Sequence, residues 1–232
     1  MSSQHPVIIL GASFYGCGLA AAYQDALLLE PSILVGSDFA LSYFPGKVDE
    51  ADSLHPDAEN LRRELIERGA LHKGRLHLAA LSPLLSDWCL RRKLKLMLNT
   101  EIIQYDDNTV QILNIQGKQV LTAEKIIDAR ASQGGTKFLA AILMTGECPA
   151  KEGVYGDLEL CHGALPNEAY VRLSLEEDCS WPEARRRFYS AWEKRPSELS
   201  ECKFQLCGNR FGSYQFANPL AALSSGLHKE EA

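Results

Sequence analysis

The order of apolar and polar positions predicts a strand, a tight turn and a helix at the start of the chain. Residues 7–10 form a continuous apolar run that ends at Gly11, and the Ala-rich segment 16–29 follows. Such a run is typical of a strand buried on both faces, and a small-residue segment favours a helix. Pro31 would end that helix, and residues 33–35 predict a second buried strand. Together these elements predict a βαβ unit with a right-handed crossover.

The rest of the chain divides into two regions of different character. Helices are expected over 56–68, starting at Pro56, and over 76–92, and strands over 94–98, 100–105, 109–115, 119–121 and 125–129. Beyond residues 132–135, strands are expected over 138–145, 158–161, 169–175 and 203–206, and helices over 181–192 and 219–229. This order predicts a first domain over residues 1–135 and 210–232, and a smaller α+β cap domain over residues 136–209.

Composition narrows the classes of partner. The chain has 232 residues, 46% of them hydrophobic, and a net charge of −6. The acidic balance argues against nucleic acid and anionic membranes as main partners. No apolar run approaches the roughly 20 residues of a membrane helix, and no basic region precedes residues 7–10 as in a signal peptide. These features predict a cytoplasmic protein with a small-molecule substrate, which leaves open a protein partner or a second copy.

The seven cysteines have irregular spacing and contain no C-x-x-C pair. This pattern predicts reduced cytosolic thiols, some of them in the core. The histidines are not spaced as metal ligands, so no metal site is predicted.

A glycine-rich turn joins the first strand to the first helix. Residues 11–16, Gly-Ala-Ser-Phe-Tyr-Gly, match G-x-G-x-x-G except that Ser13 replaces the middle glycine. Gly11 would permit the tight turn, and Gly16 would let helix and strand pack closely, while amides at the helix start bind phosphates. The Ser13 hydroxyl would either clash with a pyrophosphate or donate a hydrogen bond to it. The alternative is a tight turn that binds nothing.

Dinucleotide-binding folds also place an acidic residue after the second strand, where it holds ribose hydroxyls. The predicted strand over 33–35 puts Gly36 at that position, followed by Ser37 and Asp38. Asp38 lies two residues too far along, and Ser37 offers a weaker contact, so the expected acid is missing from its place.

These segments together resemble the FAD-dependent oxidoreductases of the glutathione-reductase structural type. The segment Ile127-Asp128-Ala129-Arg130-Ala131 is similar to the family's I-D-A-T-G, with Arg130 and Ala131 where Thr and Gly are usual. Asn218-Pro219 resembles the closing segment, whose helix begins at the flavin. The resemblance implies an α/β fold with a Rossmann-like parallel sheet, a three-layer β-β-α character and a second, smaller α+β domain.

The resemblance also implies FAD as cofactor. The residues it places around FAD are Gly11, Ser13, Tyr15, Gly16, Gly36, Ser37, Asp38, Gly46, Ala129, Arg130, Asn218 and Pro219. Arg130 would either meet a phosphate or block the site, and Tyr214 would either line the flavin pocket or pack in the core.

Three functions follow as hypotheses. The first is a flavoenzyme that moves a hydride between a small organic substrate and the flavin. The second is a non-catalytic binding or assembly subunit that lost the cofactor, which the altered glycine, the missing strand-end acid and Arg130 favour. The third is a plain nucleotide-binding Rossmann protein. No catalytic residue is identified from the sequence.

Overall fold

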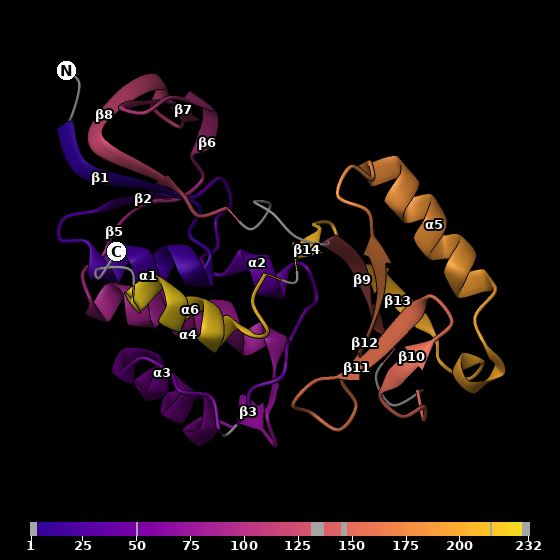
Figure 1. The fold of residues 1–232 in the computed structure, drawn as a ribbon. Coiled ribbons are helices and arrows are strands. Elements are labelled where there is room, and N and C mark those ends of the chain that lie inside the picture. Colours follow the sequence, from indigo (N-terminus) through magenta and orange to yellow (C-terminus); the bar gives the residue numbers. More distant parts are fainter. Residues whose placement is uncertain (1–3, 50, 131–136, 145–147, 214, 229–232) are drawn as a thin grey trace.

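The computed structural model describes residues 4–49, 51–130, 137–144, 148–213 and 215–228. It is an α/β structure built on two sheets (Figure 1). The predictions for Ala131 and Tyr214 lie outside the described residues.

Six helices and a single 3-10 turn occur in the described chain. They are α1 (Phe14–Ala22), α2 (Ser37–Ala40), α3 (Pro56–Glu67), α4 (Leu78–Arg91), α5 (Trp181–Glu193), α6 (Pro219–Leu227) and the 3-10 turn Ser197–Leu199.

The first sheet has, in spatial order, β5 (Lys95–Met97), β2 (Leu27–Leu29), β1 (Gln4–Leu10), β8 (Gly117–Asp128), β7 (Thr109–Asn114) and β6 (Glu101–Tyr105). The second has β10 (Gly153–Tyr155), β11 (Leu158–His162), β12 (Ala169–Leu175), β9 (Lys137–Leu143) and β13 (Phe204–Cys207), with β14 (Gly212–Ser213) also paired to β9. A small hairpin joins β3 (Leu71–His72) to β4 (Arg75–Leu76).

The parallel part of the first sheet forms the middle of three layers. Strands β5, β2, β1 and the end of β8 are parallel, whereas β6, β7 and the start of β8 form an antiparallel meander. The meander folds over one face, where Ile8 and Leu29 of the parallel strands pack with Val110 and Ile112. The helices α1, α4 and α6 cover the other face (Figure 1). This arrangement confirms the predicted α/β fold with its three-layer character.

The second strand is not where the sequence pattern placed it. Residues 33–35 are not a strand, and Ile33 is 72% exposed. Helix α1 ends at Ala22 and the chain turns at Asp25, which has φ +61°. The strand that pairs with β1 is therefore Leu27–Leu29. A three-residue leucine run fits a buried strand and a helix equally well. The sequence analysis assigned Leu27–Leu29 to the helix, and this prediction is wrong.

Strand β8 is also longer than predicted. The two short strands expected over 119–121 and 125–129 are one strand, Gly117–Asp128. Its first half pairs with β7 and its second half with β1, with Thr122 paired to both neighbours. One continuous strand thereby joins the meander to the parallel sheet.

The two faces of the second sheet have different partners. Leu139 and Ala141 of β9 pack with Phe188 of α5, whereas Phe138 and Ala140 belong to the core formed with the helices α1, α3, α4 and α6. This alternation is the period of two expected of a strand buried on both faces. The second sheet is therefore held between α5 and the helical core.

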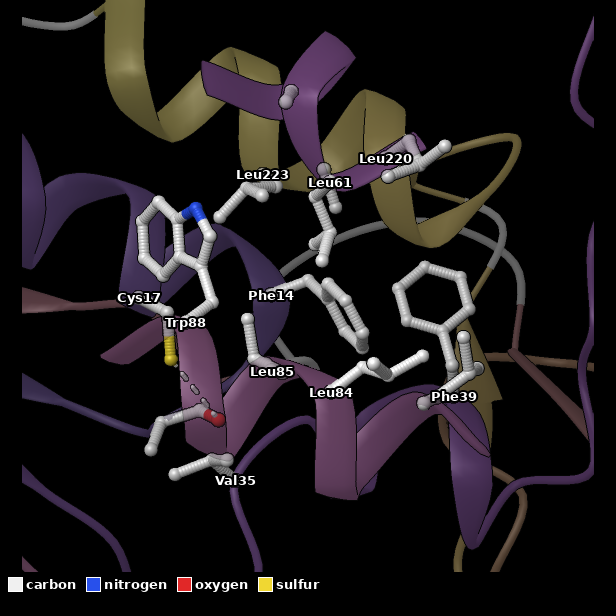
Figure 2. Packing of buried hydrophobic residues seen from close by; sticks show 14 of the residues in the cluster. Phe14, Cys17, Val35, Phe39, Leu61, Leu84, Leu85, Trp88, Leu220 and Leu223 are labelled. Atoms are coloured by element: carbon white, nitrogen blue, oxygen red, sulfur yellow. Dashed lines mark hydrogen bonds between the residues drawn. The ribbon is translucent and has the colours of Figure 1, made fainter. Parts of the chain in front are cut away.

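The helical core collects side chains from four helices and the segment around α2. Figure 2 shows Phe14 of α1 between Leu84 and Leu85 of α4 and Leu220 of α6, with Phe39 alongside. The Phe14 and Phe39 rings meet edge to face, with centroids 5.7 Å apart. Trp88 and Cys17 close the other end of this cluster.

Two of the seven cysteines depart from the predicted reduced state. Cys148 and Cys202 form a disulfide that links the segments before β10 and β13. The prediction of reduced thiols throughout is wrong for this pair, because a sequence separation of 54 hid the proximity of the two cysteines. The remaining five are free, and Cys17 is a fully buried core residue as expected.

The contact between α1 and α6 depends on glycine. A Cβ atom at Gly18 would lie 2.3 Å from the Leu223 carbonyl oxygen, which is backbone and cannot move away cheaply. The substitution Gly18→Ala should therefore lower the free energy of unfolding by about 1–3 kcal/mol, even though Ala favours a helix by about 1 kcal/mol. Urea denaturation measures this change.

The matched control is Ser225→Ala on the half-exposed side of α6, which should stay within about 0.5 kcal/mol of wild type. A stabilised Gly18→Ala protein would show that the two helices do not approach as closely as described.

Candidate functional site

A cavity of about 400 Å³ opens where the parallel strands end and the second sheet begins. Its walls come from the turn after β1, the segments after β2, β8 and β12, the start of α2, the start of β9, and β14 with the segment before it. The lining residues are Gly11, Ser13, Glu30, Pro31, Ser37, Asp38, Arg130, Lys137, Glu177, Arg210, Phe211, Gly212 and Ser213. Gly11, Ser13, Ser37, Asp38 and Arg130 were predicted site residues, and the structure brings these five together.

Ser13 is the N-cap of α1. Its hydroxyl accepts a hydrogen bond from the Gly16 N–H at 2.9 Å and donates one to the Ala129 carbonyl oxygen, also at 2.9 Å. Both hydrogen bonds are internal, so the hydroxyl orders the turn and ties it to the end of β8. Gly16 is needed for this approach, because a Cβ there would lie 2.0 Å from the Gly11 carbonyl oxygen.

Glu30 is the acidic residue that the sequence prediction placed wrongly. It follows β2 directly and is 3% exposed. One carboxylate oxygen accepts from the Ala12 N–H at 2.8 Å, and the other accepts from the Ser32 N–H at 3.0 Å. The strand-end acid is therefore present at residue 30, and neither Gly36 nor Asp38 stands in its place. The run Leu27-Leu28-Leu29-Glu30 carried this signal, since it repeats the pattern of an apolar strand before the turn.

Residues 36–38 lie beside the turn for a different reason. The Gly36 N–H donates to the Ala12 carbonyl oxygen at 2.7 Å, and Gly36 has φ +66° where it packs under the Phe14 ring. The Ser37 hydroxyl accepts from Arg210 Nη1 at 2.6 Å. A loop after β2 thus brings a second acidic residue, Asp38, to the same cavity as Glu30.

Asp38 carries an uncompensated carboxyl oxygen. Within the described residues its Oδ1 is buried and has no hydrogen-bond partner. Burial raises the pKa of this carboxyl group to about 7, although N–H groups of its own backbone and of Phe14, together with Arg210, act in the opposite direction. Its charge state therefore changes near neutral pH.

Arg130 lies directly against the turn. A Cβ at Gly11 would lie 2.9 Å from Arg130 Cγ. The guanidinium is held by Asp128, with Nε 2.9 Å from Oδ1, and the Tyr105 hydroxyl donates to Oδ2 of Asp128 at 2.8 Å. Burial opposes ionisation of Asp128, but the Arg130 and Tyr105 hydrogen bonds outweigh it and lower the pKa of Asp128. Arg130 is thus a fixed cation at the cavity wall.

Two more of the predicted residues lie beside the cavity. Tyr15 and Ala129 line a neighbouring cavity of about 20 Å³ that shares Ser13 and Asp38 with the larger one. The Tyr15 ring stacks on Phe216, with centroids 5.3 Å apart, so the segment before α6 reaches the start of α1.

Gly46, Asn218 and Pro219 line neither of these two cavities. Gly46 packs against the backbone of Ala217, and Asn218 caps α6 by accepting from the Ala221 N–H at 2.8 Å. Asn218 Nδ2 also donates to the Lys47 carbonyl oxygen at 2.9 Å. Their part in cofactor binding stays a prediction.

Sequence reasoning missed the part of the wall that faces the turn from the second sheet and the segments next to it. Lys137 Nζ donates to the Cys179 carbonyl oxygen at 2.7 Å and lies 4.5 Å from the centre of the Phe211 ring. With Arg210 and Glu177, these residues bring the charged lining to three acidic and three basic side chains. No local sequence motif predicts these residues, because only tertiary packing brings them to the turn.

Two further findings concern metal ions and membranes. Among the residues the structure describes, no group of three or more His, Cys, Asp or Glu side chains is placed to hold a metal ion. Over the same residues, no helix combines the length and apolarity needed to cross a bilayer.

The chain is similar to known proteins in its structure but matches none in the sequence comparisons. No family model and no curated protein sequence matches the chain. The flavin-dependent halogenase CmlS superposes with a TM-score of 0.59 at 13% identity, over 92% of this chain and 50% of that one. The chain has the fold of FAD-dependent oxidoreductases.

Other solved structures share this flavoprotein fold. The p-nitrophenol 4-monooxygenase PnpA from Pseudomonas putida has a TM-score of 0.53 at 14% identity, over 91% of this chain and 67% of that one. A geranylgeranyl bacteriochlorophyll reductase-like protein from Thermoplasma acidophilum has a TM-score of 0.59 at 9% identity, over 100% and 78%. The chain spans about half the length of the halogenase.

The raised pKa of Asp38 predicts a pH-dependent stability. The carboxyl group binds its proton more tightly in the folded state, with a pKa of about 7 against an ordinary value of 3.8. Its contribution is therefore greatest below pH 3.8 and is lost as pH rises toward 7. Wild type should lose about 2 kcal/mol relative to Asp38→Asn between pH 5.5 and 8, at about 1.4 kcal/mol per pH unit. Denaturant titrations at both pH values measure the difference.

The exposed substitution Asp107→Asn serves as the control and should leave the pH dependence of wild type unchanged. A wild-type profile that Asp38→Asn does not alter would mean that this carboxyl group ionises normally in the folded protein.

Proposed function

We propose that the chain binds FAD in the cavity beside the Gly11–Gly16 turn and acts as a flavin-dependent oxidoreductase on a small organic molecule. The observation that carries the proposal is the placement of Glu30. A buried carboxylate at the end of β2 is hydrogen-bonded to the turn, and both line one cavity. This is the arrangement by which dinucleotide-binding folds hold the ribose and the pyrophosphate of their cofactor.

The residues present fit an adenine dinucleotide. Each carboxylate has about four lone-pair sites, and Glu30 uses two of them on backbone N–H groups. The remaining acceptor positions suit the two hydroxyls of a ribose. A volume of about 400 Å³ also lies within the range of roughly 300–1,000 Å³ usual for small-molecule sites.

Two guanidinium groups suit the phosphates. Arg130 is fixed by Asp128, and Arg210 is fixed by the Ser37 hydroxyl. Arginines held in this way lose little conformational freedom when they bind a phosphate, and they form strong charge-assisted hydrogen bonds. We therefore assign Arg130 to phosphate binding, in preference to blocking the site.

When bound, FAD would supply the redox chemistry, and the protein would supply position and electrostatics. Glu30 would orient the ribose, while the guanidinium groups would neutralise the diphosphate. Lys137 of β9 and Phe211, which precedes β14, would close the cavity from the other side and exclude water. We further propose that residues 136–209 form the cap that contacts the substrate, and that the three-layer first domain is of the glutathione-reductase type.

The halogenase, monooxygenase and reductase-like neighbours support redox chemistry on small organic molecules. The position of Glu30 also removes one reason for inferring a lost cofactor, because the strand-end acid is not missing.

Removal of the Glu30 charge tests the proposal. The substitution Glu30→Gln should weaken FAD binding about 10- to 100-fold, since a hydrogen bond to a charged group contributes about 1.5–3 kcal/mol. Titration followed by flavin fluorescence measures the affinity, and calorimetry with adenosine isolates the ribose contact. Glu67→Gln at the exposed end of α3 is the control and should bind as wild type does.

Equal affinity of the wild type and Glu30→Gln for adenosine would place the ribose elsewhere. A colourless protein that ignores added FAD and adenosine would reject the proposed function.

A further inference from the structure

Asp38 occupies the place where a dinucleotide would bring its negative charge. The hydrogen bond from the Gly36 N–H to the Ala12 carbonyl oxygen fixes this segment on the turn, at 2.7 Å. Asp38 and Ser13 line both neighbouring cavities, so the carboxyl group lies where the cavities meet.

The carboxyl group of Asp38 acts on the first turn of α1. The Phe14 N–H stabilises its ionised form, and the opposite oxygen, Oδ1, is buried without a partner among the described residues. The Gly16 N–H is satisfied by the Ser13 hydroxyl and the Cys17 N–H by the Ser13 carbonyl oxygen. Asp38 therefore uses one of the few N–H groups of this helix start that the cap leaves available.

A phosphate and an ionised Asp38 would compete for the same position. Both are anions, both are favoured at a helix N-terminus, and in a cavity of low dielectric they repel each other strongly. The charged or titratable groups that face Asp38 or line its cavity are Cys17, Glu30, Arg130, Lys137, Glu177 and Arg210. They include three cations and two other acids, so the cations do not outnumber the acids once Asp38 is ionised.

We propose that Asp38 stands in for a ligand phosphate at the N-terminus of α1, so that a pyrophosphate binds there only when Asp38 is neutral. Asp38 is then a specificity-determining residue of the nucleotide site, and the inference rests on the proposed function. Where Asp38 is ionised before binding, as at pH 8, binding of a pyrophosphate diester takes up about one proton on its carboxyl group. Binding of a nucleoside without phosphate takes up none.

The size of the effect follows from linkage. With a pKa of about 7, the neutral fraction of Asp38 falls about tenfold between pH 6 and pH 8. The dissociation constant of a ligand that needs the neutral form should rise by the same factor of about ten.

ADP-ribose is the appropriate probe, because each phosphate of its pyrophosphate diester has lost its only proton well below pH 6. Calorimetry on the full chain at pH 6, 7 and 8 should show about tenfold weaker ADP-ribose binding at pH 8 than at pH 6. Adenosine, which has no phosphate, should bind equally at all three values. The same titration in two buffers of different ionisation enthalpy should report uptake of about one proton at pH 8 for ADP-ribose alone.

Two variants separate the effect of Asp38 from that of the overall charge of the cavity. Asp38→Asn is always neutral and should bind ADP-ribose at pH 8 as tightly as wild type does at pH 6, with no pH dependence. Glu177→Gln removes one negative charge from the same cavity and should keep the tenfold dependence.

Three outcomes would overturn the inference. One is ADP-ribose binding by wild type that is independent of pH, a result that needs no variant. Another is an Asp38→Asn protein that keeps the wild-type pH profile. The third is weaker binding by Asp38→Asn at every pH, which would make Asp38 a direct ligand. If adenosine still binds and depends on Glu30 in these cases, the proposed function stands while the inference fails. If neither adenosine nor ADP-ribose binds, both fail.

Discussion

The hydroxyl group of Ser13 holds together the chain segments on which the candidate site depends. It accepts from the Gly16 N–H and donates to the Ala129 carbonyl oxygen, so it joins the start of α1 to the end of β8. These segments lie 116 residues apart in the sequence. A glycine at position 13 would provide neither bond. Compared with a glycine at this position, Ser13 therefore leaves less space beside the turn but makes the turn more rigid.

Hydrogen bonds fix the other charged side chains of the site. Arg130 is bound to Asp128, and Arg210 to Ser37, while Glu30 is bound by two backbone N–H groups. Against this background the half-satisfied carboxyl group of Asp38 stands out. Buried polar groups are almost always paired, and those left unpaired concentrate at binding and catalytic positions. The unpaired carboxyl oxygen of Asp38 and the cavity that Asp38 lines therefore indicate the same candidate site.

The sequence predicted the periodic parts of this fold and missed what depends on tertiary contact. The run at residues 7–10, the helix start at Pro56 and the alternating strands of the second sheet all lie near their predicted positions. The second strand was misplaced because Leu27–Leu29 satisfies helix and strand patterns alike, and that one error hid Glu30. Lys137, Glu177 and Arg210 could not be found, since packing alone carries them to a turn more than a hundred residues away.

The glycine contact between α1 and α6 also has a consequence for how the chain is made. Residues 14–22 leave the ribosome early, yet the helix that covers them is formed by residues 219–227. The helical core therefore cannot be completed before α6 is synthesised, and Phe14 lacks its contact with Leu220 while the second sheet is translated. Long-range closure of this kind is slow and exposes apolar surface in the meantime. The turn after β1 gains its final support only when α6 packs against α1, so a nascent chain without α6 lacks a finished candidate site.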